Sequence, residues 1–326
     1  SRMLKVEFSK ANKEDIKNLM ITLQNQGYKD QTVGGYQAIL KRFYNWLLGN
    51  NEFYPEQVRW IKKKKNNGHF DKELITEADV KKMIEVADIQ DKAMITLLYE
   101  SGMRSGELRS LQLKHIKFDD FGGVIFIPDG KTGSRRIRVF NCCIYLKNYI
   151  ETRNENPEGY LFTSKDGEYR SLNSTTLNKR VKTLAEKSKI NKKIFCHLLR
   201  HSRATVLANH LSEAQMNAYF GWVQGSSKMA SVYVHLSGRD VDDALLNKVY
   251  GIKDLKKEIL ESELKPKTCV YCQQVNEATR KFCQKCGKPI DLTTRMQYEE
   301  KREKYDGALI EFFEKNADLK DKLLDF

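Results

Sequence analysis

The stretch KIFCHLLRHSRAT, residues 193–205, concentrates two histidines and two arginines in one short segment. His197 and Arg200 are three residues apart, so a helix would place both side chains on one face. These two side chains together suit a phosphate, because the guanidinium can bind two phosphate oxygens and the imidazole can donate a further hydrogen bond. The alternative is an ordinary basic helix face in contact with water, and this stretch alone does not decide between the two.

Two segments earlier in the chain add side chains of the same kind. SGMRSGELRSL places Arg104 just after an expected helix end, with Ser105 as the expected N-cap of the next helix and Glu107 in its first turn. Lys131 lies in DGKTGS, the expected turn of a β-hairpin formed by VIFIPDGKTGSRRIRVF. Considered singly, Arg104 could be an ion-pairing arginine and Lys131 a solvated turn lysine.

A fourth segment, FGWVQGSSKMASVYVHLSGRD at 220–240, contains Trp222 and Tyr233. A tyrosine can attack phosphorus and hold the phosphoryl group covalently. Arginines stabilise the charge of the pentavalent phosphate, and a lysine can protonate the leaving 5′ oxygen. The four segments together therefore predict a phosphoryl-transfer site that needs no metal. Trp222 alone could equally be a core aromatic residue.

The elements that would position these residues are mostly helices. Residues 8–66 have apolar side chains at helical intervals and predict a small four-helix module. Residues 1–70 contain 13 Lys and Arg against 6 Asp and Glu, a net charge of +7, which suits contact with DNA. A merely lysine-rich surface is the alternative. KKKKNNGHFDKE, residues 62–73, has the composition of a linker.

A second domain is expected to begin near LITEADVKKMIEVA, with Thr76 as a helix N-cap and Asp79 completing a capping box. The apolar stretch DKAMITLLYESG predicts a helix that ends at Gly102. The hairpin with Lys131 follows, and helices are expected again from about 141 to 250.

Composition restricts the class of protein. The chain has 326 residues, a formal net charge of +14 and a pI of about 9.3, which favours a polyanionic partner such as nucleic acid. No apolar run is long enough for a membrane span, and the first residues lack a signal-peptide core. We therefore expect an intracellular protein whose seven cysteines are reduced thiols or metal ligands.

Four of these cysteines form two C-x-x-C pairs within 264–291. Four thiolates at such spacing form a closed, tetrahedral zinc site, so we predict a zinc ribbon with a structural role. Free thiols or disulfides are the alternative. The predicted ligands are Cys269, Cys272, Cys283 and Cys286. The remaining cysteines, Cys142, Cys143 and Cys196, are expected to be small buried residues.

The order of GMRSGEL, GKTGS, HLLRH and FGW…VYVHL, over residues 8 to about 250, resembles the tyrosine recombinase (phage-integrase) family. The resemblance implies Arg104 and Arg200 as the catalytic arginines, with Glu107 supporting the first, and Tyr233 as the nucleophile. It also implies Lys131 as general acid, His197 as the histidine of H-x-x-R, and Trp222 where many members have a histidine. Tyr219 is a rival hydroxyl, but YVHL follows the family pattern and favours Tyr233. His201 and Arg203 are expected to be neighbours without a chemical role.

The resemblance further implies a fold and an assembly. We predict a mainly α chain with a small β hairpin or sheet (α+β) that closes around DNA as a C-shaped clamp. Family members act as tetramers on two duplexes and exchange a C-terminal helix, for which 239–251 is the candidate. The predicted parts are a helical, SAM-like DNA core-binding domain at 1–66, a linker at 67–73, a catalytic domain at 74–255, a zinc ribbon at 264–291 and a helical tail at 292–326.

The predicted function is site-specific cleavage and rejoining of double-stranded DNA through a 3′-phosphotyrosine and a Holliday junction, without ATP or a catalytic metal. The ribbon resembles that of integrases from archaeal viruses and plasmids, and the expected location is the cytoplasm, on the nucleoid. The alternatives are a type IB topoisomerase, a catalytically silent DNA-binding protein and a zinc-ribbon transcription factor. The tail is expected to contact protein through Leu309, Phe312 and Phe313.

Overall fold

The computed structural model describes residues 4, 6–49, 53–62, 73–128, 133–153, 156–164, 170–223, 233 and 262–315. The chain divides into two compact units, Ser1–Phe70 and Asp71–Phe326. Within the described ranges, no helix combines the length and the apolar character that crossing a membrane would require.

The first unit contains three helices in its described residues, α1 (Lys13–Asn25), α2 (Asp30–Leu48) and α3 (Glu56–Arg59), where the sequence predicted four. Asn12 caps α1 by accepting hydrogen bonds from the backbone N–H groups of its first turn, and Asp15 completes the capping box. The apolar stripe of α1 faces the core as predicted, since these residues are buried: Ile16, Leu19, Met20 and Leu23.

The apolar pattern of α2 is only partly used for the core. Leu40 is buried against α1, and Phe43 and Leu47 pack at the edge of that cluster. Ile39 and Trp46 are instead exposed, with 76% of Trp46 accessible. Helical spacing alone therefore predicted a wider buried face than α2 has.

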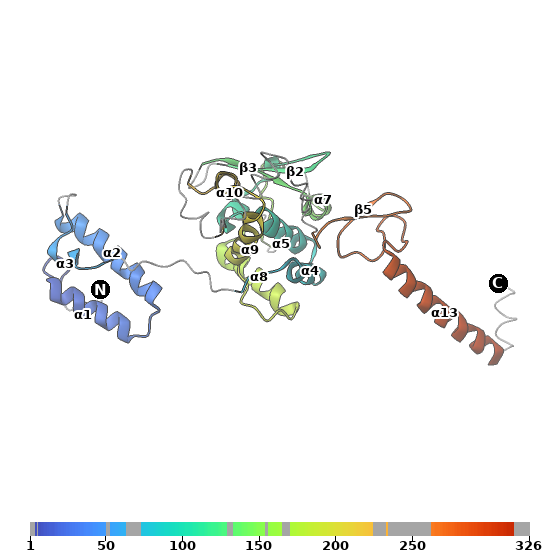
Figure 1. Ribbon diagram of the computed structural model, residues 1–326, viewed down its shortest axis with the longest axis horizontal. Helices are drawn as coiled ribbons and strands as arrows, with labels where there is room; N and C mark the ends of the chain where they lie inside the picture. The colour runs from blue at the N-terminus through green and yellow to red at the C-terminus, as the bar shows by residue number, and fades with distance from the viewer. Residues whose placement is uncertain are drawn as a thin grey trace, which may run out of the picture. The chain divides into compact units, whose positions relative to one another are not determined.

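The second unit is mostly helical, with a small sheet along one side of its helices (Figure 1). Helix α5 is buried along nearly its whole length and packs against α4, α7, α9 and β3. Thr76 and Asp79 form the predicted capping box at the start of α4. The helices before the ribbon are α4 (Glu77–Glu85), α5 (Ile89–Ser101), α6 (Ser105–Ser110), the short 3₁₀ helix η1 (Leu113–His115), α7 (Cys143–Ile150), α8 (Ser174–Lys187), α9 (Cys196–Ala208) and α10 (Glu213–Phe220).

Gly102 ends α5 as predicted, in the left-handed conformation with φ of +56°. A Cβ atom at this position would lie 2.4 Å from Cε1 of Phe220, so only glycine fits. The turn brings the chain to Arg104, which is itself the N-cap of α6. The prediction of Ser105 as N-cap was therefore wrong by one residue.

The sheet has three antiparallel strands in the order β1 (Ile116–Asp119), β2 (Gly122–Ile127) and β3 (Arg135–Val139). The β2–β3 pair is the predicted hairpin, and β1 was not predicted. Ile125 is opposite Ile137, and both are fully buried. Lys131, in the hairpin turn, lies outside the described residues.

A small segment with two short strands, β4 (Lys267–Thr268) and β5 (Val275–Asn276), comes later in the second unit and contains the four-cysteine cluster. The helix α13 (Leu292–Lys315) comes next and is exposed along nearly all of its described length. Leu309 and Phe312 are about half exposed, whereas the side chain of Phe313 lies outside the described residues.

Candidate active site of the second unit

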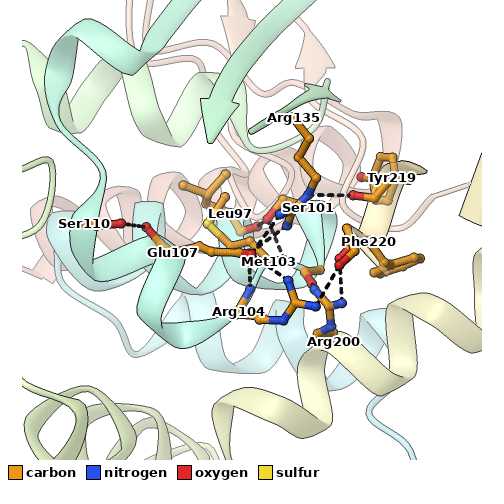
Figure 2. A network of polar contacts seen from close by, with 12 residues as sticks. Leu97, Ser101, Met103, Arg104, Glu107, Ser110, Arg135, Arg200, Tyr219 and Phe220 are labelled. Carbon is orange, nitrogen blue, oxygen red and sulfur yellow. Dashed lines mark hydrogen bonds and ion pairs between the residues drawn. The ribbon is translucent and has the colours of Figure 1, made fainter. Parts of the chain in front are cut away.

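Arg200 lies on α9 and is almost completely buried, with 4% of its surface accessible. Its Nη1 donates to the carbonyl oxygen of Gly102 at 2.8 Å, and its Nη2 donates to that of Phe220 at 2.7 Å (Figure 2). The guanidinium also lies over the rings of Phe220 and Trp222, at 5.2 and 5.7 Å from their centroids. Burial and, to a lesser extent, the charge of Arg104 lower the pKa of Arg200 to about 9.

Arg104 is the more accessible of the two predicted arginines, with 34% of its side chain exposed. Its Nη1 donates to Oε1 of Glu107 at 2.8 Å, and its Nη2 donates to the carbonyl oxygen of Gly221 at 2.8 Å. The second oxygen of Glu107 accepts from the backbone N–H of Arg104 at 2.7 Å. Glu107 therefore holds both the backbone and the side chain of Arg104 in place.

A third arginine, Arg135 at the start of β3, shares the same carboxylate, and sequence analysis did not identify it. Its Nη1 and Nη2 donate to the two oxygens of Glu107 at 2.8 and 2.7 Å (Figure 2). Burial alone would raise the pKa of Glu107, but the hydrogen bonds from Arg135 and Arg104 lower it to about 2. Its position, four residues after Lys131, carries no signal that separates it from the neighbouring Arg136 and Arg138.

The end of α10 is bound by all three arginines. The carbonyl oxygens of Tyr219, Phe220 and Gly221 accept in turn from Arg135, Arg200 and Arg104. The last carbonyls of a helix lack partners within the helix and carry partial negative charge, so cations bind there favourably. The three guanidiniums thus fix the turn that leads directly to Trp222.

Trp222 stacks on the ring of Tyr233, with centroids 5.7 Å apart and planes at 5°. On its other side it stacks on Phe220, with centroids 4.9 Å apart. Both Trp222 and Tyr233 are buried, in one apolar cluster with Phe220. Burial raises the pKa of Tyr233 to about 12, although the nearby charge of Arg200 opposes this shift. Tyr233 is therefore a neutral phenol at neutral pH.

His201 is a second side chain near the site to which the sequence analysis gave no chemical role. Its Nδ1 is in hydrogen-bond contact with Oη of Tyr233. His197, one helical turn earlier, is exposed, and its ring meets that of His201 edge to face with centroids 4.4 Å apart. The H-x-x-R-H spacing places positions 197 and 201 on one helix face, but it does not show that Tyr233 lies beside them.

The structure thus brings together most of the predicted site. Arg104, Glu107 and Arg200 surround the turn before Trp222, and Tyr233 stacks on that tryptophan. Tyr219, the rival hydroxyl, donates to the carbonyl oxygen of Glu100 at 2.9 Å.

The four cysteines of the predicted ribbon form a separate cluster, with all Sγ atoms within 4.8 Å of one another. The two halves are built alike: the backbone N–H of Gln273 donates to the oxygen of Cys269, and that of Gly287 donates to the oxygen of Cys283, each at 2.9 Å. Both Gln273 and Gly287 have positive φ, of 59° and 68°. Each half is therefore a tight knuckle that presents two thiols to one point.

The geometry of the cluster fits a tetrahedral zinc ion. The Sγ atoms of Cys269 and Cys286 are 3.6 Å apart, and those of Cys272 and Cys283 are 3.5 Å apart. Four sulfurs at about 2.3 Å from a central zinc would be separated by about 3.8 Å. The measured separations are far too long for disulfides. The other three cysteines are buried as predicted.

Comparison with known proteins identifies the family. Residues 73–239, just over half of the chain, match the model of the phage integrase family. The chain belongs to the phage integrase family. The matched residues include every predicted catalytic position, from Arg104 to Tyr233, and the four-cysteine segment follows them.

Among the curated relatives of this chain is tyrosine recombinase XerC of Escherichia coli O127:H6 (strain E2348/69 / EPEC), which is 23% identical to it over 198 residues. XerC of Shigella flexneri serotype 5b (strain 8401) is 22% identical over the same length. Each alignment covers 58% of this chain and 65% of the relative, so the chain spans slightly less than two thirds of these relatives.

Solved structures of the same fold include the Tn1549 transposon integrase with circular intermediate DNA, with a TM-score of 0.59 at 17% identity. That match covers 75% of this chain and 88% of the integrase. The lambda integrase dimer bound to a COC′ core site gives a TM-score of 0.53 at 15% identity, over 70% and 84% of the two chains. At these identities the likeness establishes the fold.

Proposed function

We propose that this protein is a site-specific tyrosine recombinase that cleaves and rejoins double-stranded DNA. The observation that carries the proposal is the arrangement of two guanidiniums, those of Arg104 and Arg200, around the turn that carries Trp222 and its stacked partner Tyr233. Arginine donors near a buried phenol suit the charge that develops when an oxygen nucleophile attacks a phosphodiester. Membership of the phage integrase family and relatives named as tyrosine recombinases support it.

In the proposed reaction, Oη of Tyr233 bonds to the scissile phosphorus and the bond to the 5′ oxygen breaks. The phenol proton passes to His201, whose nitrogen contacts that hydroxyl. Lys131, in the hairpin turn, would protonate the leaving 5′ oxygen, and His197 would donate to the phosphate. The products are a 3′-phosphotyrosine and a 5′ hydroxyl. The phosphoester is conserved, so a 5′ hydroxyl of a partner strand can reverse the step without ATP and form a Holliday junction.

The proposal assigns the two units to separate tasks. Residues 1–66 would form a basic, SAM-like core-binding domain, and residues 74–255 the catalytic domain, joined by the linker 67–73 so that the two close around DNA as a C-shaped clamp. The net charge of +7 in residues 1–70 supports DNA contact by the first part. A homotetramer on two duplexes, with exchange of 239–251, would align both pairs of strands. Residues 239–251 lie outside the described residues, and sizing on assembled sites would test the tetramer.

A suicide substrate tests the proposed reaction. A nicked duplex with the attachment site of the protein would lose its short 5′ fragment after cleavage, which traps the 3′-phosphotyrosine. We expect wild-type protein to give a covalent band on a denaturing gel in the presence of EDTA, because the proposed chemistry uses no catalytic metal.

Two outcomes would contradict the recombinase. If DNA is bound and no covalent band forms, a catalytically silent DNA-binding protein is indicated. If the band forms but supercoiled DNA is relaxed without recombinant products, a type IB topoisomerase is indicated instead. A zinc-ribbon transcription factor would give neither activity.

We further propose that the ribbon binds one structural zinc ion and is docked on the catalytic helices. Glu277, whose side chain is nearly fully buried, accepts from Nζ of Lys92 on α5 and from Nδ2 of Asn148 on α7, both at 3.1 Å. Ser262 and Glu263 bind the carboxylate of Glu77 at the start of α4. These contacts support a ribbon that belongs to the catalytic unit, rather than one that reaches for DNA independently.

Metal removal gives a measurable prediction. We expect one zinc per chain by elemental analysis and its loss in Cys283→Ser, because three thiolates cannot complete the closed site. In the variant, limited proteolysis should cleave within 262–291 first. Cys143→Ser is the matched control, since that thiol is buried elsewhere and donates to the carbonyl of Val139. Equal zinc content in Cys283→Ser and wild type would contradict the site.

The source and the location are proposals of the same kind. A ribbon placed directly after the catalytic domain supports an integrase of an archaeal virus, plasmid or integrated element, as the sequence suggested. A chromosomal or plasmid DNA substrate implies action in the cytoplasm, on the nucleoid. Recovery of the protein with chromatin from its source cells would test the location.

A further inference from the structure

Arg135 is an arginine near the site that the proposed chemistry leaves without a role. It is the first residue of β3, and only 8% of its side chain is exposed. Its three nitrogen atoms all donate within the site: Nη1 and Nη2 to Glu107, and Nε to the carbonyl oxygen of Tyr219 at 3.1 Å (Figure 2). The side chain therefore links the β-hairpin, α6 and the end of α10.

The carboxylate of Glu107 is saturated by this arrangement. It accepts two hydrogen bonds from Arg135 and two from Arg104, and an ionised carboxylate has about four acceptor positions. Bidentate pairing of a buried guanidinium with a carboxylate fixes both partners geometrically. The orientation of Arg104 is thus determined by a carboxylate that Arg135 itself orients.

The turn at Gly221 is shaped around the same guanidinium. Gly221 has φ of +60°, and a Cβ atom there would lie 2.6 Å from Nη1 and 2.9 Å from Cζ of Arg135. The backbone of the turn therefore passes directly against the guanidinium. Trp222 follows at once and stacks on Tyr233, so the position of Arg135 also determines where the indole lies.

We propose that Arg135 is a positioning residue for strand cleavage, which acts through Glu107 on Arg104 and through the 219–221 turn on Trp222. This inference rests on the proposed recombinase function. Arg135 is buried behind the carboxylate, and its role is to hold the groups that would meet the phosphate. A misplacement of about 1 Å in such groups can cost about a hundredfold in rate.

The test compares single-turnover cleavage of saturated suicide substrate by full-length Arg135→Gln, Arg135→Lys and Arg136→Gln. We expect about a hundredfold slower cleavage for Arg135→Gln, with DNA binding within a few fold of wild type. Arg135→Lys should recover little, because an ammonium cannot pair with both carboxylate oxygens in plane. Arg136→Gln removes the same charge from the exposed face of β3 and should cleave at the wild-type rate once DNA is saturated.

A pH profile separates positioning from a general loss of structure. The charged groups around Glu107 in the described residues are Arg104, Arg135 and Arg200. Without Arg135, the carboxylate loses two hydrogen bonds and a neighbouring cation, so its pKa rises from about 2. Cleavage by Arg135→Gln should therefore fall on acidification from pH 7 to pH 5 more steeply than cleavage by wild type.

A double-mutant cycle completes the test. Because Arg135 acts in part through Glu107, the loss of rate in the double variant Arg135→Gln/Glu107→Gln should be smaller than the product of the two single losses. Losses that multiply, or wild-type cleavage by Arg135→Gln, would overturn the inference. Both results require that wild type forms the covalent band. If wild type forms none on bound DNA, the proposed function itself fails, and that outcome is distinct from the others.

Discussion

Replacing Tyr233 with phenylalanine is expected to abolish the covalent protein–DNA adduct and to leave DNA binding unchanged. The change removes one oxygen atom and keeps the ring that stacks on Trp222. Because the ring packing remains, the fold around Arg200 should persist, and thermal unfolding should occur within a few degrees of wild type. The measurement is the suicide-substrate gel, on which the loss should exceed about three orders of magnitude, since no other group can form the intermediate.

Tyr219→Phe is the matched control for this experiment. Tyr219 is the other tyrosine near the turn, but its hydroxyl donates to the carbonyl of Glu100, and burial raises its pKa far above the usual range. We therefore expect Tyr219→Phe to keep the adduct, with at most the modest loss of stability caused by one missing hydrogen bond. An adduct in Tyr233→Phe that disappears in Tyr219→Phe would assign the nucleophile to Tyr219.

The local geometry around Arg104 and on α9 was recoverable from the sequence because it depends on local signals. Gly102 ends α5, and the N-terminal turn of α6 brings Glu107 back to Arg104, both within short segments of chain. The helical spacing in HLLRH likewise fixes which face His197 and Arg200 share. Local rules were sufficient at these positions because the relevant contacts lie within about one helical turn or one tight turn.

Contacts between distant segments were not recoverable in this way. Arg135 pairs with a carboxylate 28 residues earlier and with a carbonyl 84 residues later, and nothing in SRRIRVF marks which of its three arginines points inward. The inward face of β3 was determined by its register with β2. His201 was similarly assigned to packing, because only the fold shows that Tyr233 lies over it.

In the first unit, the spacing of apolar residues predicted a wider buried helix face than the structure has. Ile39 and Trp46 continue the apolar spacing of α2 and yet are exposed, because α1 and α3 cover only a narrower stripe of that helix. The described residues of this unit contain three helices, and the predicted module of four remains a prediction. Burial of a helix face depends on how many other elements pack against it, and the spacing of apolar residues along the helix does not give that number.

Arg200→Lys is expected to lose about three orders of magnitude in single-turnover cleavage while it still binds DNA. The guanidinium donates to two carbonyl oxygens, those of Gly102 and Phe220. In the proposed reaction it would also donate to the phosphate, which makes three acceptors. A lysine ammonium offers donors from a single atom and cannot reach all three groups, and loss of one such donor costs about 10²–10³ in rate. Arg203→Lys, one turn later on α9, is the control, since Nε of Arg203 donates to the carbonyl oxygen of Glu100.

Burial of this cation also predicts how stability depends on pH. The pKa of Arg200 is about 9 when folded, below the ordinary value of 12.5, so the unfolded chain holds this proton more tightly. The cost of burying the charge is fully present below pH 9 and is relieved as pH rises from about 9 toward 12.5. The melting temperature of wild type should therefore rise relative to that of Arg200→Met between pH 8 and pH 10.

A phosphate bound at the site would pair with the charge of Arg200, so a short DNA duplex should stabilise wild type more than Arg200→Met. Equal stabilisation of the two proteins by DNA would contradict a phosphate contact at Arg200.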